Sequence, residues 1–267
     1  MHTYTDFGMH KTPFTRELTN DERFNLPYMD AALDGLRSAI EARMSAALIA
    51  PAGTGKTALL RKLRESLPQA RYKVHTIKVT GLAKRDFCRE ISCAVGASPA
   101  GTYPMLVRRL QERFGHSLSV DGLRPVILID EAHDLKPSVL AVLRLLTNFN
   151  MDSELVLSLI LAGQPPLGAL LQRDDLVAMS GRLAHIAKLR VMSRDESLKY
   201  LRHRVALAGS VNFPFDNSSA EGIFEIARGN LRATDRLART ALDCAVEAGE
   251  TVVTANHVVA ARERLTV

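Results

Sequence analysis

The sequence predicts an α/β fold with a parallel sheet covered by helices on both faces, followed by a small all-helical domain. Through the first two thirds of the chain, apolar segments of strand length alternate with longer segments of helical periodicity. A glycine-containing loop, APAGTGKT at 50–57, joins one predicted strand directly to a helix. From Ser193 onward only helical periodicity remains.

The N-terminal part of the chain predicts an arm, a helix and the first strand. Residues 1–27 contain few apolar repeats and two prolines, so we expect an arm there. The segment 29–44 has helical spacing and leads into a short apolar strand at 46–50. After the glycine-containing loop, 56–67 predicts a helix, and 72–80 alternates and is β-branched, as a strand should be.

The middle of the chain continues the alternation of strands and helices, which implies parallel strands. We predict helices at 83–96, 103–114 and 137–149, and strands at 124–130, 154–163 and about 185–190. Four further helices are expected at 194–209, 218–229, 230–249 and 254–265. The resulting domains are the arm at 1–27, an α/β domain at 28–192 and a helical lid domain at 193–267.

Composition narrows the class of protein. The 267 residues, 46% hydrophobic and 24% charged, are enough for a large α/β core with a small appended domain, and the net charge of +6 favours polyanions as partners. The three cysteines lack the paired spacing of a zinc site and are odd in number, so no disulfide framework is expected. The N-terminus has no apolar signal segment and no run approaches the ~20 apolar residues of a membrane span, so we expect a cytoplasmic protein without membrane contact.

The loop at 50–57 predicts a phosphate-binding site. Gly53 and Gly55 let the backbone curl around a phosphate, Lys56 can reach the β and γ phosphates, and the Thr57 hydroxyl suits Mg²⁺. Ala50 occupies the first position of the pattern, where glycine is usual, and a small residue with negative φ can serve at a strand end. The expected ATP-binding residues of this segment are Pro51, Ala52, Gly53, Thr54, Gly55, Lys56, Thr57 and Ala58.

Two adjacent carboxylates end the strand VILIDE at 126–131. We expect Asp130 to hold Mg²⁺ and Glu131 to orient and polarise the attacking water, because phosphoryl transfer depends on positioning and charge neutralisation. The alternative is that both acids only cap the following helix, which four preceding apolar residues disfavour. His133 and Asp134 are interpreted as surface residues or residues behind the ligands rather than as ligands.

These segments resemble a known superfamily. APAGTGKT, VILIDEAH and LILAGQPPL at 159–167 resemble the Walker A, Walker B and sensor 1 segments of the AAA+ P-loop ATPases. Within it, the stretch 180–209 and GNLRATDRLARTAL at 229–242 are similar to the ExeA-like branch of general secretion pathway protein A. That branch includes the TniB and TnsC type ATPases of transposition, with MuB and IstB as more distant functional relatives. The similarity runs from about residue 12 to the C-terminus.

The resemblance implies further site residues. Gln164 falls on the sensor 1 position, Arg232 on sensor 2, and Arg182 on the arginine finger that one subunit inserts into the site of its neighbour. Tyr28, before the first helix, is placed near the adenine. Alternatively, Gln164 is a turn residue, both arginines are solvated charges and Tyr28 is part of the core.

The same resemblance implies a DNA contact after the second strand of the sheet. Lys84 and Arg85, with Thr102 before the next helix, match the region that touches the DNA backbone in the transposition ATPases. Such phosphate contacts are sequence-tolerant and salt-sensitive. The charges are also consistent with solvated helix faces. With 5% aromatic residues and no Trp, a platform for stacking bases is not expected.

The leading functional hypothesis is an oligomeric, DNA-stimulated ATPase that uses ATP and Mg²⁺, binds double-stranded DNA as a ring or filament, and recruits a DDE transposase to target DNA. A secretion-pathway assembly ATPase is the first alternative, although such proteins add a membrane segment and a cell-wall-binding domain. The second alternative is an interaction module that binds nucleotide without turnover. The presence of Lys56, Asp130 and Glu131 argues against that module.

Overall fold

The computed structural model describes residues 4–78, 81–151 and 153–266 and forms two compact units. The α/β unit consists of Pro27–Ala52 and Lys56–Leu189. The helical unit consists of the N-terminal segment through Leu26, the loop residues Gly53–Gly55 and the chain from Arg190 onward. We describe each unit by itself.

A five-stranded sheet forms the centre of the α/β unit, and every neighbouring pair of strands is parallel. Its order is β2-β3-β4-β1-β5, so the first strand lies inside the sheet between the fourth and the fifth. This confirms the predicted parallel α/β fold. The strands are β1 (Ser45–Ile49), β2 (Tyr72–Lys78), β3 (Arg124–Asp130), β4 (Ser158–Gly163) and β5 (Leu183–Lys188). The last two residues of the strand predicted at 72–80 lie outside the described residues.

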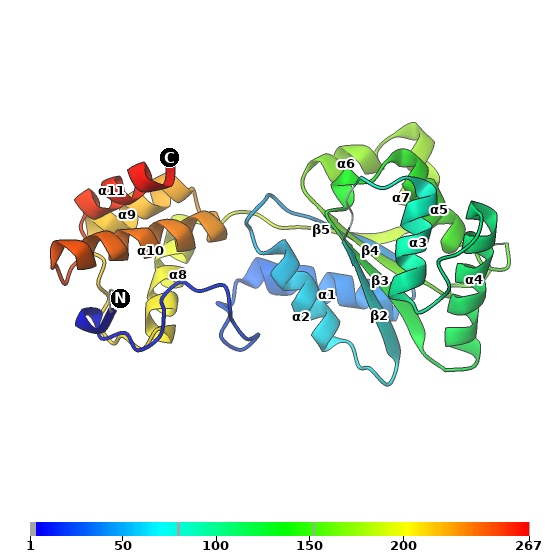
Figure 1. Cartoon of the computed structure of the whole chain (residues 1–267), viewed down its shortest axis with the longest axis horizontal. Helices are drawn as coiled ribbons and strands as arrows, with labels where there is room; N and C mark the ends of the chain where they lie inside the picture. The colour runs from blue at the N-terminus through cyan, green and yellow to red at the C-terminus, as the bar shows by residue number, and fades with distance from the viewer. Residues whose placement is uncertain (1–3, 79–80, 152, 267) are drawn as a thin grey trace. The chain divides into compact units, whose positions relative to one another are not determined.

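Helices cover both faces of this sheet, as predicted (Figure 1). Alternate residues of β3 enter two separate apolar cores: Val126 and Leu128 join one, and Ile127 and Ile129 the other. The first core is completed by α1 (Pro27–Glu41) and α2 (Lys56–Ser66). The second is completed by α3 (Lys84–Ala94), α4 (Tyr103–Ser119), α5 (Pro137–Leu146), α6 (Pro166–Leu171) and the short α7 (Val177–Ser180). The sequence did not predict α6 and α7, since GQPP was interpreted only as the end of a strand.

The helical unit contains the four predicted helices: α8 (Arg194–Leu207), α9 (Asn217–Ala227), α10 (Leu231–Ala248) and α11 (Ala255–Thr266). Side chains of Ser193, Asp216 and Asn230 cap the first three of them by accepting hydrogen bonds from backbone N–H groups. At α8 the cap is reciprocal, because Glu196 also accepts from the backbone N–H of Ser193 at 2.7 Å. The helix starts are therefore encoded locally.

The N-terminal segment is part of the core of the helical unit. Phe7, Met9 and Phe14 are buried in the same apolar cluster as residues of α8 to α11. Arg204 of α8, 3% exposed, donates from Nη2 to the carbonyl of Thr15 at 2.5 Å. The sequence suggested an arm leading into the first helix, and its lack of periodicity gave no sign of this packing.

Candidate functional site

The predicted polar residues lie where β1, β3 and β4 end. Asp130 is the last residue of β3 and Gly163 the last of β4, and Ile49 at the end of β1 is in register with Gly163. Since β4 pairs with both β1 and β3, the carboxyl ends of the three strands meet at one edge of the sheet. In open α/β sheets this edge is where ligands bind.

The loop after β1 has the backbone that a phosphate loop requires. Gly53 and Gly55 have φ values of 77° and 95°, in the region that favours glycine. Ala50 is fully buried outside that region, and its N–H donates to the carbonyl of Gly163 at 3.0 Å. Alanine is therefore compatible with the first position of the loop. Lys56 follows as the first residue of α2, so its ammonium extends from a helix N-terminus.

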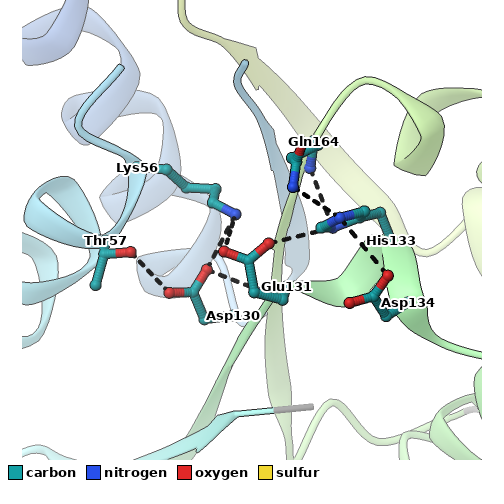
Figure 2. A network of polar contacts seen from close by, with 7 residues as sticks. All are labelled: Lys56, Thr57, Asp130, Glu131, His133, Asp134 and Gln164. Atoms are coloured by element: carbon teal, nitrogen blue, oxygen red, sulfur yellow. Dashed lines mark hydrogen bonds and ion pairs between the residues drawn. The ribbon is translucent and has the colours of Figure 1, made fainter. Parts of the chain in front are cut away.

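Lys56 binds both carboxylates at the end of β3. Its Nζ lies 2.8 Å from Oε1 of Glu131 and 3.3 Å from Oδ1 of Asp130 (Figure 2). The Lys56 side chain is 7% exposed and that of Asp130 10%, so the ion pair is largely withdrawn from water. Thr57 donates from its hydroxyl to Oδ2 of Asp130 at 2.9 Å. The structure thus brings together the cation, the hydroxyl and the two acids that the sequence singled out.

Glu131 has an unusual backbone conformation. Its φ and ψ are 55° and 35°, a left-handed conformation that costs a non-glycine residue about 1–2 kcal/mol. Its N–H donates to Oδ1 of Asp130 at 2.9 Å, and the short 3-10 helix η2 (Ala132–Asp134) follows. The turn separates the two adjacent carboxylates, so that Asp130 bonds Thr57 while Glu131 faces His133 (Figure 2).

His133 lies between Glu131 and Gln164. Its Nδ1 is 3.4 Å from Oε2 of Glu131, and its Nε2 is 2.9 Å from the side-chain nitrogen of Gln164. The ring is 13% exposed. Of the two interpretations, surface or behind the ligands, the structure supports the second for His133. Sequence reasoning did not identify its contact with Gln164, because that contact depends on the pairing of β3 with β4.

The remaining predicted nucleotide-site residues lie apart from this cluster. Tyr28, the second residue of α1, packs against the core that α1 and α2 share. Arg182 precedes β5, and its Nη1 donates to the carbonyl of Thr147 at 3.4 Å. Arg232 is an exposed residue in the first turn of α10, in the helical unit. Their roles toward nucleotide remain predictions.

The three residues predicted to contact DNA form one surface at the starts of α3 and α4. Lys84 Nζ lies 5.0 Å from the centre of the Tyr103 ring, and Arg85 Nη2 donates to the carbonyl of Gly101 at 3.2 Å. Lys84, Arg85 and Thr102 are all exposed. Two helix N-termini lie beside these cations, and both features favour an anion.

The donor set fits Mg²⁺ in the presence of phosphate. The Thr57 hydroxyl and the Asp130 carboxylate are hard oxygen ligands already in contact. No group of three or more His, Cys, Asp or Glu side chains in the described part of the chain could hold a metal ion alone. Mg²⁺ is commonly held by one or two carboxylates together with substrate phosphates, so the residues fit a metal that arrives with a nucleotide.

Comparison with known proteins agrees with this geometry. Residues 39–171 match the family model of the AAA domain. The chain is 30% identical over 201 residues to general secretion pathway protein A of Aeromonas hydrophila, covering 74% of this chain and 36% of that protein. The chain thus spans about a third of the length of this relative. None of the described helices is long and apolar enough to cross a membrane.

Solved structures with the same fold include replication proteins. The Orc1 protein of Aeropyrum pernix in complex with DNA has a TM-score of 0.67 at 22% identity, covering 93% of this chain and 68% of that one. Cdc6p of Pyrobaculum aerophilum has a TM-score of 0.68 at 19% identity, covering 90% and 67%. At these identities the likeness shows the fold alone.

Proposed function

We propose, from the premise that this chain is an AAA+ ATPase in domain and fold, that it hydrolyses ATP as an oligomer on double-stranded DNA. In this proposal it selects target DNA and recruits a DDE transposase. The observation that carries the catalytic part is the contact of Lys56 with both Asp130 and Glu131. A cation that neutralises two acids beside a phosphate loop can exchange them for phosphate oxygens when nucleotide binds.

The same contacts define the role of each residue. Lys56 turns to the β and γ phosphates of ATP, which releases Oε1 of Glu131 to accept a hydrogen bond from the attacking water. Thr57 and Asp130 hold the Mg²⁺, which neutralises charge on the phosphates when bound. Binding of ATP is therefore the event that frees the catalytic carboxylate.

Assembly completes the proposed site. Arg182 serves as the finger that reaches the γ phosphate of a neighbouring subunit, and Gln164 contacts that phosphate or the water. Arg232 contacts the nucleotide from the helical unit, and Tyr28 lies near the adenine. Hydrolysis then depends on self-association, in a ring or a filament.

The surface at α3 and α4 supports DNA as the polyanion. Lys84 and Arg85 are exposed beside two helix N-termini, which suits contacts with phosphates rather than with base edges. The relation to Orc1, which has been solved with DNA, is consistent with this partner. Recruitment of a transposase rests on the resemblance to the TniB and TnsC type ATPases alone.

A second candidate is an assembly ATPase of a secretion pathway. The 30% identity to general secretion pathway protein A favours it, although the match covers 36% of that protein. The two candidates differ in their need for DNA, so DNA binding decides between them.

The experiment measures duplex DNA affinity with a non-hydrolysable ATP analogue as a function of salt. Wild type is compared with Lys84→Ala/Arg85→Ala and with Arg61→Ala/Arg64→Ala, which removes two exposed charges from α2 on the other face of the sheet. We expect the first variant to reduce the salt dependence by about 0.9 per lost phosphate contact, and the second to leave it unchanged. Both should retain nucleotide. DNA binding that is absent in wild type, or equal in all three proteins, contradicts the proposed DNA contact.

A further inference from the structure

The carboxylate of Glu131 is held from two sides. Lys56 lies at Oε1, at 2.8 Å, and His133 lies at Oε2, at 3.4 Å (Figure 2). The first contact is one that phosphate competes for, since Lys56 follows the phosphate loop as the first residue of α2. The second contact comes from the same strand-end turn as Glu131 itself and does not compete with phosphate.

The ring of His133 also connects to the end of the neighbouring strand. Its Nε2 lies 2.9 Å from the side-chain nitrogen of Gln164, and its Nδ1 lies 3.4 Å from the backbone nitrogen of Gln164. Asp134 approaches Nε2 with Oδ1 at 3.7 Å. One tautomer satisfies the two side-chain contacts: Nδ1–H donates to Glu131, and Nε2 accepts from the Gln164 amide.

The backbone fixes this arrangement. His133 belongs to η2, directly after β3, and Gln164 follows β4, which pairs with β3. A side chain at Gly163 would approach the backbone nitrogen of His133 to 3.0 Å, so the two strand ends lie in close contact. The His133 ring, 13% exposed, has little freedom to leave its place.

We propose that His133 is a positioning residue that keeps Glu131 aligned for the water after Lys56 has turned to phosphate, and that couples Glu131 to Gln164. This inference rests on the proposed hydrolysis. His133 touches neither nucleotide nor water; it acts through Glu131. The contact at Oε2 persists when Oε1 is released, so the free carboxylate oxygen faces the nucleotide in a defined orientation.

Kinetics of four variants test the role. In Asn the amide nitrogen occupies the place of Nδ1, whereas in Gln it extends toward the place of Nε2. We therefore expect His133→Ala and His133→Gln to lower kcat about 10- to 100-fold with little change in KM, and His133→Asn to recover much of that loss. His116→Asn, an exposed histidine of α4, should match wild type. Equal loss in the Ala, Gln and Asn variants overturns the proposal.

A double-mutant cycle tests the coupling to Gln164. If His133 transmits the position of Gln164 to Glu131, the kcat loss of His133→Ala with Gln164→Ala will be smaller than the product of the two single losses. Losses that multiply contradict the coupling. Binding of a fluorescent ATP analogue should be the same in all of these proteins.

Nitrogen NMR of the imidazole tests the contact without requiring turnover. In the nucleotide-free protein we expect His133, assigned by its loss in His133→Asn, as the Nδ1–H tautomer, shifting toward Nε2–H in Glu131→Ala. An Nε2–H tautomer that Glu131→Ala leaves unchanged overturns the inference. Wild type that turns over no ATP contradicts the proposed function instead, and the spectra still decide whether His133 holds Glu131.

Discussion

Gly163→Ala tests whether the site depends on close contact between the ends of β3 and β4. A Cβ at position 163 would lie 3.0 Å from the backbone nitrogen of His133 and 3.0 Å from Cδ2 of Leu167. The leucine side chain can yield, but the backbone of η2 cannot move without displacing His133 and Glu131. Overpacking of this kind costs about 1–3 kcal/mol of unfolding free energy.

The matched control is Gly115→Ala. Gly115 lies inside α4, and no atom of another element lies within 4 Å of the place where its Cβ would be. Because glycine is a poor helix former, alanine there should stabilise the protein by about 0.5–1 kcal/mol.

The assay combines urea unfolding, followed by circular dichroism because the chain has no Trp, with ATP turnover at a temperature where both variants are folded. We expect Gly163→Ala to lose turnover beyond its loss of stability, and Gly115→Ala to keep full turnover. A Gly163→Ala protein as stable and as active as wild type refutes the argument that the strand ends are in tight contact.

Three further predictions concern the helical unit and use the same unfolding assay. Phe14→Ala should destabilise it by about 3–5 kcal/mol, because the buried ring packs edge-on against Phe215 at 6.2 Å; a loss below about 1 kcal/mol would mean that the N-terminal segment is not part of the core. Ser193→Ala should cost about 1 kcal/mol by removing the cap of α8, whereas Ser218→Ala, next to a cap, should cost less. Arg190 and the backbone of Ser193 lower the pKa of Glu196 to about 2, so its stabilising contribution is complete above pH 4.5 and is lost as the pH falls toward 2. Glu196→Gln should therefore be less stable than wild type at pH 7 and approach it at pH 2.5, and a difference independent of pH would contradict this.

Much of the α/β unit could be predicted because its signals are local. A fully buried strand such as β3 is a continuous apolar segment, and the loop at 50–57 carries its glycines where φ is positive. The polar residues then follow from position alone, since parallel strands present their carboxyl ends at one edge. Lys56, Asp130 and Glu131 were found in this way.

What the sequence did not predict depends on long-range packing. The ring of His133 meets Gln164 only because β3 and β4 are neighbours, and sequence order does not give the order of strands in a sheet. Phe14 has a φ of 53°, so tertiary packing outweighs a local preference there, and no periodicity announces its burial. Residues 4–26 were therefore interpreted as an arm.

The central claim is tested most directly by ATP turnover of wild type and Glu131→Gln, each with and without duplex DNA. The structure predicts turnover in wild type that rises with DNA, and almost none in Glu131→Gln, which should still bind ATP and remain on DNA as an ATP-bound assembly. The Gln side chain keeps the shape of Glu131 but cannot act as the carboxylate that polarises water. Turnover by Glu131→Gln at the wild-type rate would contradict the role assigned to this site.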